Sequence, residues 1–320
     1  MLGVSTRRGF AAHSNARIFP QPSLLACHLP LQGTKSASIA FVIELNDGPV
    51  EATVVINRSG PDMCHSQNRM DDCILETRNL AKEFKGFIAV CDVSLNVRKG
   101  VIHGLIGPNG AGKTTVFNML TKFIAPTRGT IHFKGDDITS ETPAQIARRG
   151  IVRSFQISAV FPHLTVLENV RIALQRKLGT SFHFWRSENS LKQLNGQALE
   201  LLEDVGLRSQ AGVVAVELPY GSKRALEIAT TLALDPELLL LDEPTQGMGH
   251  EDVEKVKGLI RKVAAHRTVL MVEHNMSVVS HLCDTISVMQ RGSVIAEGSY
   301  EQVSGNPQVM EAYMGVAAND

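Results

Sequence analysis

Residues 107–115, Gly107-Pro-Asn-Gly-Ala-Gly-Lys-Thr-Thr115, decide how the rest of the chain is interpreted. They match G-x-x-x-x-G-K-T, the phosphate-binding P-loop. A mostly apolar run at Val101–Ile106 precedes the loop and predicts a buried strand. After the loop, apolar residues recur at helical spacing: Val116, Phe117, Met119, Leu120 and Phe123. This is the strand–loop–helix context that the motif requires.

Each residue type in the loop has a physical role in holding an anion. Glycines let the backbone curl so that several N–H groups point at one anion, and the positive end of the following helix faces the same point. Lys113 can reach the β- and γ-phosphates of a nucleotide, and the Thr114 hydroxyl can bind Mg²⁺. The residues expected to hold the nucleotide are Gly107, Pro108, Asn109, Gly110, Ala111, Gly112, Lys113, Thr114 and Thr115.

Composition limits the class of protein. The chain has 320 residues and a formal net charge of +0, which suits one large domain or two small ones. The neutral balance argues against a nucleic-acid binder that relies on bulk positive charge. Its 5 cysteines are scattered and fit free thiols in a reducing cytosol better than disulfides or a zinc site. No run of about eighteen apolar residues occurs, so no membrane-spanning helix is expected.

Residues 1–72 differ from the rest of the chain. They are rich in Pro, Ser, Gly and Asn and show no lasting periodicity. Residues 1–41 contain basic residues but no Asp or Glu, a composition that resembles a mitochondrial transit peptide. A disordered tail, a small appendage, and upstream sequence added by an early start codon are the other interpretations. We favour a start at Met70, with Met63 as the other option, and expect no chemistry from this segment.

Two stretches before the P-loop alternate apolar and polar residues, Ile74–Leu80 and Val90–Val97, and predict half-buried strands. Phe84 lies just before the turn at Lys85-Gly86 between them. An aromatic ring there can stack on adenine. From the residues alone, a phenylalanine at the edge of the core is an equally good interpretation.

Polar residues follow the ends of three further predicted strands. Gln156 ends the strand at 151–156, Asp242-Glu243 follows the leucine run at 238–241, and His274 comes after the strand at 268–272 and Glu273. The carboxyl ends of parallel strands meet at the edge where α/β sheets bind ligands. A P-loop strand beside an acid-tipped strand is the arrangement of nucleotide-hydrolysing enzymes.

These residues have expected roles in that chemistry. Asp242 would hold Mg²⁺, and Gln156 would place its amide oxygen on Mg²⁺ or on the attacking water. Glu243 is expected to polarise the water. His274 would bond the γ-phosphate and hold Glu243 in register.

Helical periodicity dominates from about residue 158 to 216. Within it, Ser181–Arg186 holds the only Trp and forms an aromatic cluster. Such a cluster is either a partner-docking patch or satellite core, and we favour core.

Taken together, these motifs resemble those of the ATP-binding subunits of ABC transporters, over about Ile74 to Gly315. Residues 107–115 match Walker A, Gln156 the Q-loop, 238–243 Walker B, 246–249 the D-loop and His274 the H-switch. Phe84 falls where the family has its adenine-stacking aromatic, which favours that interpretation. The family's Leu-Ser-Gly-Gly-Gln signature corresponds to Leu218, Pro219, Tyr220, Gly221 and Ser222.

The resemblance implies an α/β fold: a P-loop ABC ATPase domain with a RecA-like core, an antiparallel β subdomain and a helical subdomain. We expect the domain at 73–316, its helical subdomain at about 158–224, and a tail at 317–320. ATP and Mg²⁺ are the implied cofactors. Two such domains would sandwich two ATP molecules head to tail, so that each signature faces the partner's ATP.

Three stretches look like the branched-chain amino-acid importer subclass, namely 162–170, 224–229 and 309–315, as does the long insertion between Lys177 and Gln197. The implied partners are permease membrane subunits docked near the Q-loop and helical insertion, a second ATP-binding subunit in a homo- or heterodimer, and indirectly an extracytoplasmic solute-binding protein. No nucleic acid partner is expected. The implied location is peripheral, at the cytoplasmic face of the inner (plasma) membrane.

The chain departs from the family pattern in the signature half of the site. Pro219 replaces the signature serine, Ser222 replaces its glutamine, and Gly249 stands where the D-loop often has Asp. The Walker half is intact. We expect an ATPase that drives import of branched-chain amino acids or a related amide. The alternatives are a lipid or lipopolysaccharide exporter ATPase and a non-transport ABC ATPase.

Overall fold

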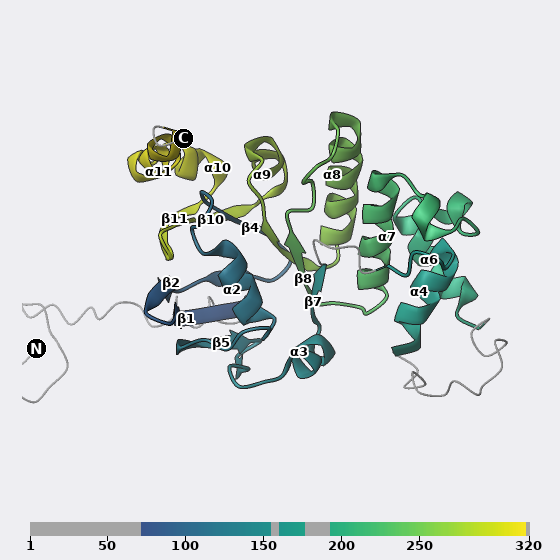
Figure 1. Cartoon of the computed structure of the whole chain (residues 1–320), viewed down its shortest axis with the longest axis horizontal. Helices are drawn as coiled ribbons and strands as arrows, with labels where there is room; N and C mark the ends of the chain where they lie inside the picture. The colour runs from purple at the N-terminus through teal and green to yellow at the C-terminus, as the bar shows by residue number, and fades with distance from the viewer. Residues whose placement is uncertain (1–71, 155–159, 177–192, 318–320) are drawn as a thin grey trace, which may run out of the picture. The chain divides into compact units, whose positions relative to one another are not determined.

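The computed structural model describes residues 72–154, 160–176 and 193–317 (Figure 1). Gln156 and the aromatic stretch 181–186 lie outside the described residues, as do residues 1–71. Within the described ranges, no helix combines the length and apolar character needed to cross a membrane.

A six-stranded sheet carries the P-loop. Its strands are β4 (Ile102–Ile106), β7 (Ile151–Ser154), β8 (Leu238–Asp242), β9 (Thr268–Val272), β10 (Thr285–Gln290) and β11 (Ser293–Gly298). The order is β11-β10-β4-β9-β8-β7, and all neighbours run parallel except β10 and β11. Strands β4, β8 and β9 are buried along their whole length. Burial on both faces explains why these strands are continuous apolar runs in the sequence.

A second, antiparallel sheet is built on the long strand β1. Its strands are β1 (Cys73–Phe84), β2 (Phe87–Val93), β3 (Asn96–Arg98), β5 (Arg128–Phe133) and β6 (Asp136–Asp137). One hydrophobic cluster contains Leu75 of β1, Leu105 of β4 and Phe117 of the helix α2 (Lys113–Leu120). The two sheets and the helix that follows the P-loop therefore share one core.

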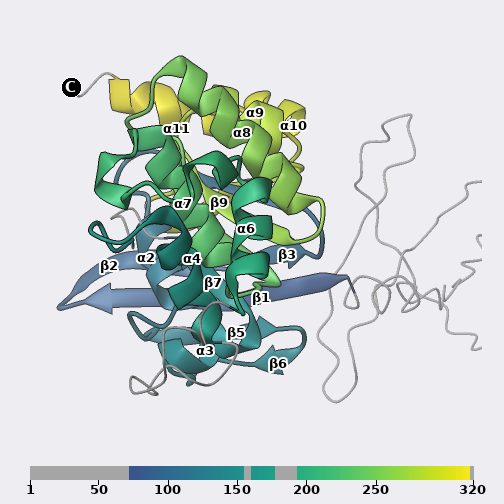
Figure 2. The same ribbon diagram turned by 90° about the vertical axis from the view of Figure 1, so that its right-hand side faces the viewer.

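Three of the remaining described helices pack against one another. Helices α4 (Val166–Gln175), α6 (Asn195–Asp204) and α7 (Tyr220–Leu232) pack together around buried Val170, Leu202 and Leu226. Figure 1 labels this group, and Figure 2 views it face on. The others are α3 (Pro143–Arg149), α8 (His250–Ala264), α9 (Met276–Leu282), α10 (Tyr300–Ser304) and α11 (Pro307–Ala317), with short 3-10 turns at Arg208–Gln210 and Ala215–Glu217.

The strand expected at 268–272 agrees with the structure residue for residue. The single strand expected at Val90–Val97 is wrong, because two short strands, β2 and β3, occupy that stretch. The break between them is bridged by Thr77, whose Oγ1 donates to the Val93 carbonyl at 3.0 Å and accepts from Leu95 N at 2.9 Å. A buried threonine on β1 thus replaces the missing ladder bonds.

Helix α7 begins at Tyr220, inside the stretch that corresponds to the family signature. Pro219 stands at the N-cap with φ −57°, and proline fixes φ near the helical value without needing a backbone donor. Gly221 in the first turn weakens the sequence signal for a helix.

Candidate active site

Three strand ends bring the candidate residues to one edge of the six-stranded sheet. Strands β4, β9 and β8 are consecutive parallel neighbours, so their carboxyl ends lie together. The P-loop follows β4, Asp242 ends β8 with Glu243 next to it, and Glu273 and His274 follow β9. This edge is the expected meeting point of the Walker residues and the H-switch.

The P-loop has a backbone that only glycine accommodates at two points. Gly107 has φ 147°, and a Cβ there would lie 2.1 Å from the Met289 carbonyl oxygen. Gly112 has φ 101°, and a Cβ there would lie 2.7 Å from the Ala89 carbonyl oxygen. Helix α2 starts immediately afterwards, and the N–H groups of its first turn have no acceptor within the helix. The loop therefore fits a phosphate group.

Lys113 is buried and curls over the loop. Its Nζ donates to the carbonyls of Gly107 at 2.7 Å and Pro108 at 3.0 Å. Burial lowers the pKa of Lys113, while the charges of Glu243 and Asp242 act in the opposite direction. The positive charge of Lys113 is therefore close enough to interact with the negative charges of Glu243 and Asp242.

Asp242 is 2% exposed and is held from two sides. Its Oδ2 accepts a hydrogen bond and ion pair from Arg153 on β7. Its carbonyl accepts from Arg224 on α7 at 3.2 Å, and Arg224 also pairs with Glu227 at 2.6 Å. The helix that begins at the signature is therefore bonded directly to the end of the Walker B strand.

Glu243 and His274 lie near each other. Glu243 has φ 44°, and its backbone N–H donates to the Val272 carbonyl at 2.9 Å. His274 Nδ1 lies 3.8 Å from Glu243 Oε1. This distance is too long for a hydrogen bond but places the imidazole beside the carboxylate.

Sequence reasoning missed Glu273. Its carboxylate is fully buried at 0% exposure. It accepts from Thr245 Oγ1 at 2.6 Å, Thr245 N at 3.1 Å, His274 N at 3.1 Å and Asn275 N at 3.3 Å. One side chain thereby joins the residue that precedes the D-loop to the H-switch. The only signal in the sequence was an acid at the end of an apolar strand.

The donor set at this edge fits Mg²⁺. Asp242 carries a carboxylate and Thr114 a hydroxyl, which are the hard oxygen donors that Mg²⁺ prefers. The described residues contain no group of three His, Cys, Asp or Glu that would hold a metal alone. Mg²⁺ is characteristically bound through one or two protein oxygens, with phosphate and water completing the shell. Gln156, the other expected ligand, lies outside the described residues.

Phe84 stands at the end of β1, opposite Phe87 at the start of β2. It is 43% exposed, and Lys82 Nζ lies 5.2 Å from its ring centroid. The ring is therefore partly open to a planar partner such as adenine.

The signature residues are tied to other loops of the same chain. Leu218 is buried, Pro219 caps α7, and the Tyr220 hydroxyl donates to the Gln246 carbonyl at 3.2 Å. A Cβ at Gly221 would lie 2.9 Å from Asp252 Cγ on α8. Ser222 is partly buried in the first turn of α7.

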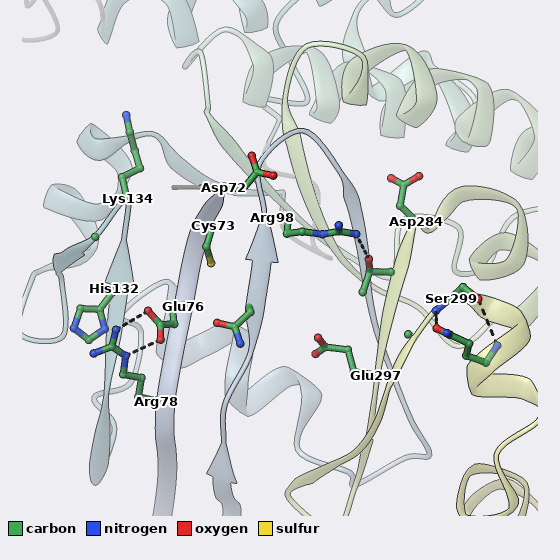
Figure 3. Close-up of a pocket in the computed structure, with 15 residues that line it drawn as sticks. Asp72, Cys73, Glu76, Arg78, Arg98, His132, Lys134, Asp284, Glu297 and Ser299 are labelled. Carbon is green, nitrogen blue, oxygen red and sulfur yellow. Dashed lines mark hydrogen bonds and ion pairs between the residues drawn. The ribbon is translucent and has the colours of Figure 1, made fainter. Parts of the chain in front are cut away.

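A separate cavity of about 940 Å³ lies between the antiparallel sheet and β10–β11. Its walls carry charges of both signs, as Figure 3 shows, with Glu76 and Arg78 paired at 2.6 Å. Arg98 donates to Thr285 at 3.3 Å, and Glu297 accepts from Ser287 at 2.7 Å. No candidate residue lines this cavity, so it is distinct from the P-loop edge.

Known proteins of similar sequence are also ATP-binding subunits of transporters. Residues 90–246 match the ABC transporter family, and residues 293–319 match the family described as branched-chain amino acid ATP-binding cassette transporter. The high-affinity branched-chain amino acid transport ATP-binding protein BraF of Pseudomonas aeruginosa is 40% identical over 254 residues, covering 76% of this chain and 98% of BraF. LivG of Escherichia coli K12, of the same description, is 39% identical over 255 residues, covering 78% and 100%.

Solved structures agree in fold. A nucleotide-free ATP-binding cassette from an ABC transporter has a TM-score of 0.67 at 31% identity, covering 75% of this chain and 98% of that one. A structure of an ATP-binding cassette of an ABC transporter in its ADP conformation has a TM-score of 0.68 at 32% identity, covering 76% of this chain and 99% of that one. This chain belongs to the ABC transporter family of ATP-binding subunits and is an ATPase with the ABC cassette fold.

Proposed function

We propose that this chain couples ATP hydrolysis to the import of branched-chain amino acids or a related amide, with an ATPase domain at 73–316. The observation that carries the substrate class is the likeness, over nearly their whole length, to relatives named for branched-chain amino acid transport. The match of the C-terminal residues 293–319 to a family with the same description supports it.

The geometry at the sheet edge supports the hydrolytic roles that we propose. Lys113 neutralises the β- and γ-phosphates of ATP within the P-loop. Asp242 and Thr114 hold Mg²⁺, which supplies positive charge against the phosphate oxygens when bound. Glu243 polarises the attacking water. His274, 3.8 Å from Glu243 Oε1, orients that carboxylate and bonds the γ-phosphate.

The remaining expected residues complete the site. Gln156 contributes its amide oxygen to Mg²⁺ or to the water, and Phe84 stacks on adenine. Residues 218–222 face the ATP of a second ATP-binding subunit in a head-to-tail dimer. Backbone N–H groups at the start of α7 support that role, since a helix N-terminus favours an anion.

An apolar groove supports the proposed permease contact. It has a volume of about 360 Å³ and is lined by residues of α3, β7, α4 and α7. Phe123 and Phe161 on its rim are both more than half exposed. An exposed apolar groove beside the strand that leads to Gln156 suits an apolar segment of a permease. This contact would hold the chain at the cytoplasmic face of the membrane, with a solute-binding protein acting on the other side.

The test is uptake by the assembled transporter. The tagged chain is purified with the membrane subunits that accompany it and reconstituted with ATP inside the vesicles. Uptake of labelled leucine, isoleucine or valine with the wild type, and none with Glu243→Gln, supports the proposal. Export-type membrane subunits, or no uptake of these amino acids or their amides, would overturn it in favour of a lipid exporter or a non-transport ATPase.

A further inference from the structure

Arg153 ties three elements together at the candidate active site. Its side chain is 9% exposed and pairs with Asp242 Oδ2 at the end of β8. Its NH1 donates to Asn118 Oδ1 on α2 at 2.6 Å, and its guanidinium lies 5.7 Å from the centroid of the Phe117 ring. Strand β7, the Walker B strand and the helix that follows the P-loop meet at this guanidinium.

The carboxylate that Arg153 engages is the one proposed to hold Mg²⁺. Arg153 gives a carboxylate that is 2% exposed a hydrogen bond and a partner of opposite charge. The same pairing opposes a second cation at that carboxylate, because two positive charges would then share one negative group. Arg153 is held in place by Asn118 and Phe117, which are not themselves charged, so its position does not depend on Asp242 alone.

We propose that Arg153 is a built-in counter-cation of Asp242 that competes with Mg²⁺ and sets the Mg²⁺ affinity of the site. It is a positioning residue: it acts through Asp242 and not on the nucleotide. The inference rests on the proposed use of Mg²⁺ at Asp242. Mg²⁺ has to displace the charge-assisted contact of Arg153 with Asp242, and a hydrogen bond to a charged group corresponds to at least about a tenfold change in an equilibrium constant. Loss of Arg153 is therefore expected to tighten Mg²⁺ binding at least about tenfold.

The experiment measures binding and needs no turnover. The full chain is saturated with a fluorescent ATP analogue, and Mg²⁺ is titrated while the fluorescence is followed. The variants are Arg153→Met, which removes the charge, and Arg153→Lys, which keeps it without the two-pronged contact to Asp242 and Asn118. Arg149→Met is the matched control, because Arg149 pairs with Asp136 and Glu141 on the surface.

The expected result is an apparent Mg²⁺ Kd at least about tenfold lower in Arg153→Met, a smaller decrease in Arg153→Lys, and no change in Arg149→Met. If Arg153→Met does not fold, Arg153→Gln, which also removes the charge, takes its place, and an unchanged Kd there overturns the inference. Wild-type affinity in Arg153→Met overturns it while leaving the proposed function intact. If Mg²⁺ changes the fluorescence of the bound nucleotide neither in the wild type nor in any variant, the proposed metal site is wrong. The inference about Arg153 is then wrong as well.

Discussion

Replacing Glu273 with alanine tests whether its buried carboxylate holds the two catalytic loops together. The carboxylate accepts four hydrogen bonds, at 2.6 to 3.3 Å, from the Thr245 hydroxyl and from the backbone of Thr245, His274 and Asn275. The substitution removes all four acceptors at a position that is 0% exposed. The three N–H groups and the hydroxyl are then left without that acceptor.

The size of the effect follows from these contacts. A hydrogen bond to a charged group contributes about 1.5–3 kcal/mol, but four bonds to one carboxylate are not additive, and the variant no longer bears the cost of a buried charge. We therefore expect a net loss of about 3–5 kcal/mol, because each buried donor that is left unsatisfied costs about 1–3 kcal/mol. For a domain of this size, about 1 kcal/mol shifts Tm by about 2–4 °C, so Tm should fall by at least about 6 °C.

The assay is thermal unfolding followed by circular dichroism. Thr245→Val removes only the 2.6 Å hydroxyl bond and should lower Tm by less than half as much. Glu203→Ala is the control, since Glu203 is 62% exposed and paired with an exposed Arg208, and a surface pair contributes about 0–1 kcal/mol. If Glu273→Ala melts within about 2 °C of the wild type, the carboxylate does not hold these loops.

Three further predictions concern the nucleotide and the chain's start. Lys113→Ala should abolish tight ATP binding, measured by equilibrium binding, because the cation leaves the P-loop; wild-type affinity would contradict its role. Pro219→Ser should strengthen ATP-dependent dimerisation by roughly ten- to a hundred-fold, as one hydrogen bond to a charged group contributes about 1.5–3 kcal/mol; ultracentrifugation showing no change would mean that Ser222 or the backbone already makes the contact. A chain starting at Met70 should keep its ATPase rate, since every candidate residue follows Ile74; a large loss would assign the N-terminal segment a role in the ATPase.

The sequence predicts this fold well where burial alone decides the structure. Strands β8 and β9 are buried on both faces, so their apolar runs predict both the strands and the edge where Asp242 and His274 emerge. The P-loop is equally clear, because its fixed residues are contiguous in the sequence, although the close contacts with Met289 and Ala89 that also require Gly107 and Gly112 are not visible there.

The sequence does not reveal contacts made between distant residues. From the sequence alone, Glu273 is an acid that precedes a loop. In the structure it is buried and accepts a hydrogen bond from Thr245, which lies 28 positions earlier in the chain. From the sequence alone, Arg153 is one polar residue in a short predicted strand. In the structure β7 pairs with β8, and the Arg153 side chain contacts Asp242 at the end of β8. Pairing of neighbouring strands decides both cases, and single-strand periodicity carries no information about it.

The most direct test of the account is hydrolysis by Glu243→Gln. The amide keeps the shape of the side chain and removes the base. We predict that the variant binds ATP with wild-type affinity and has no measurable steady-state turnover of ATP. Wild-type turnover in this variant would contradict the assignment of Glu243 as the residue that polarises the attacking water.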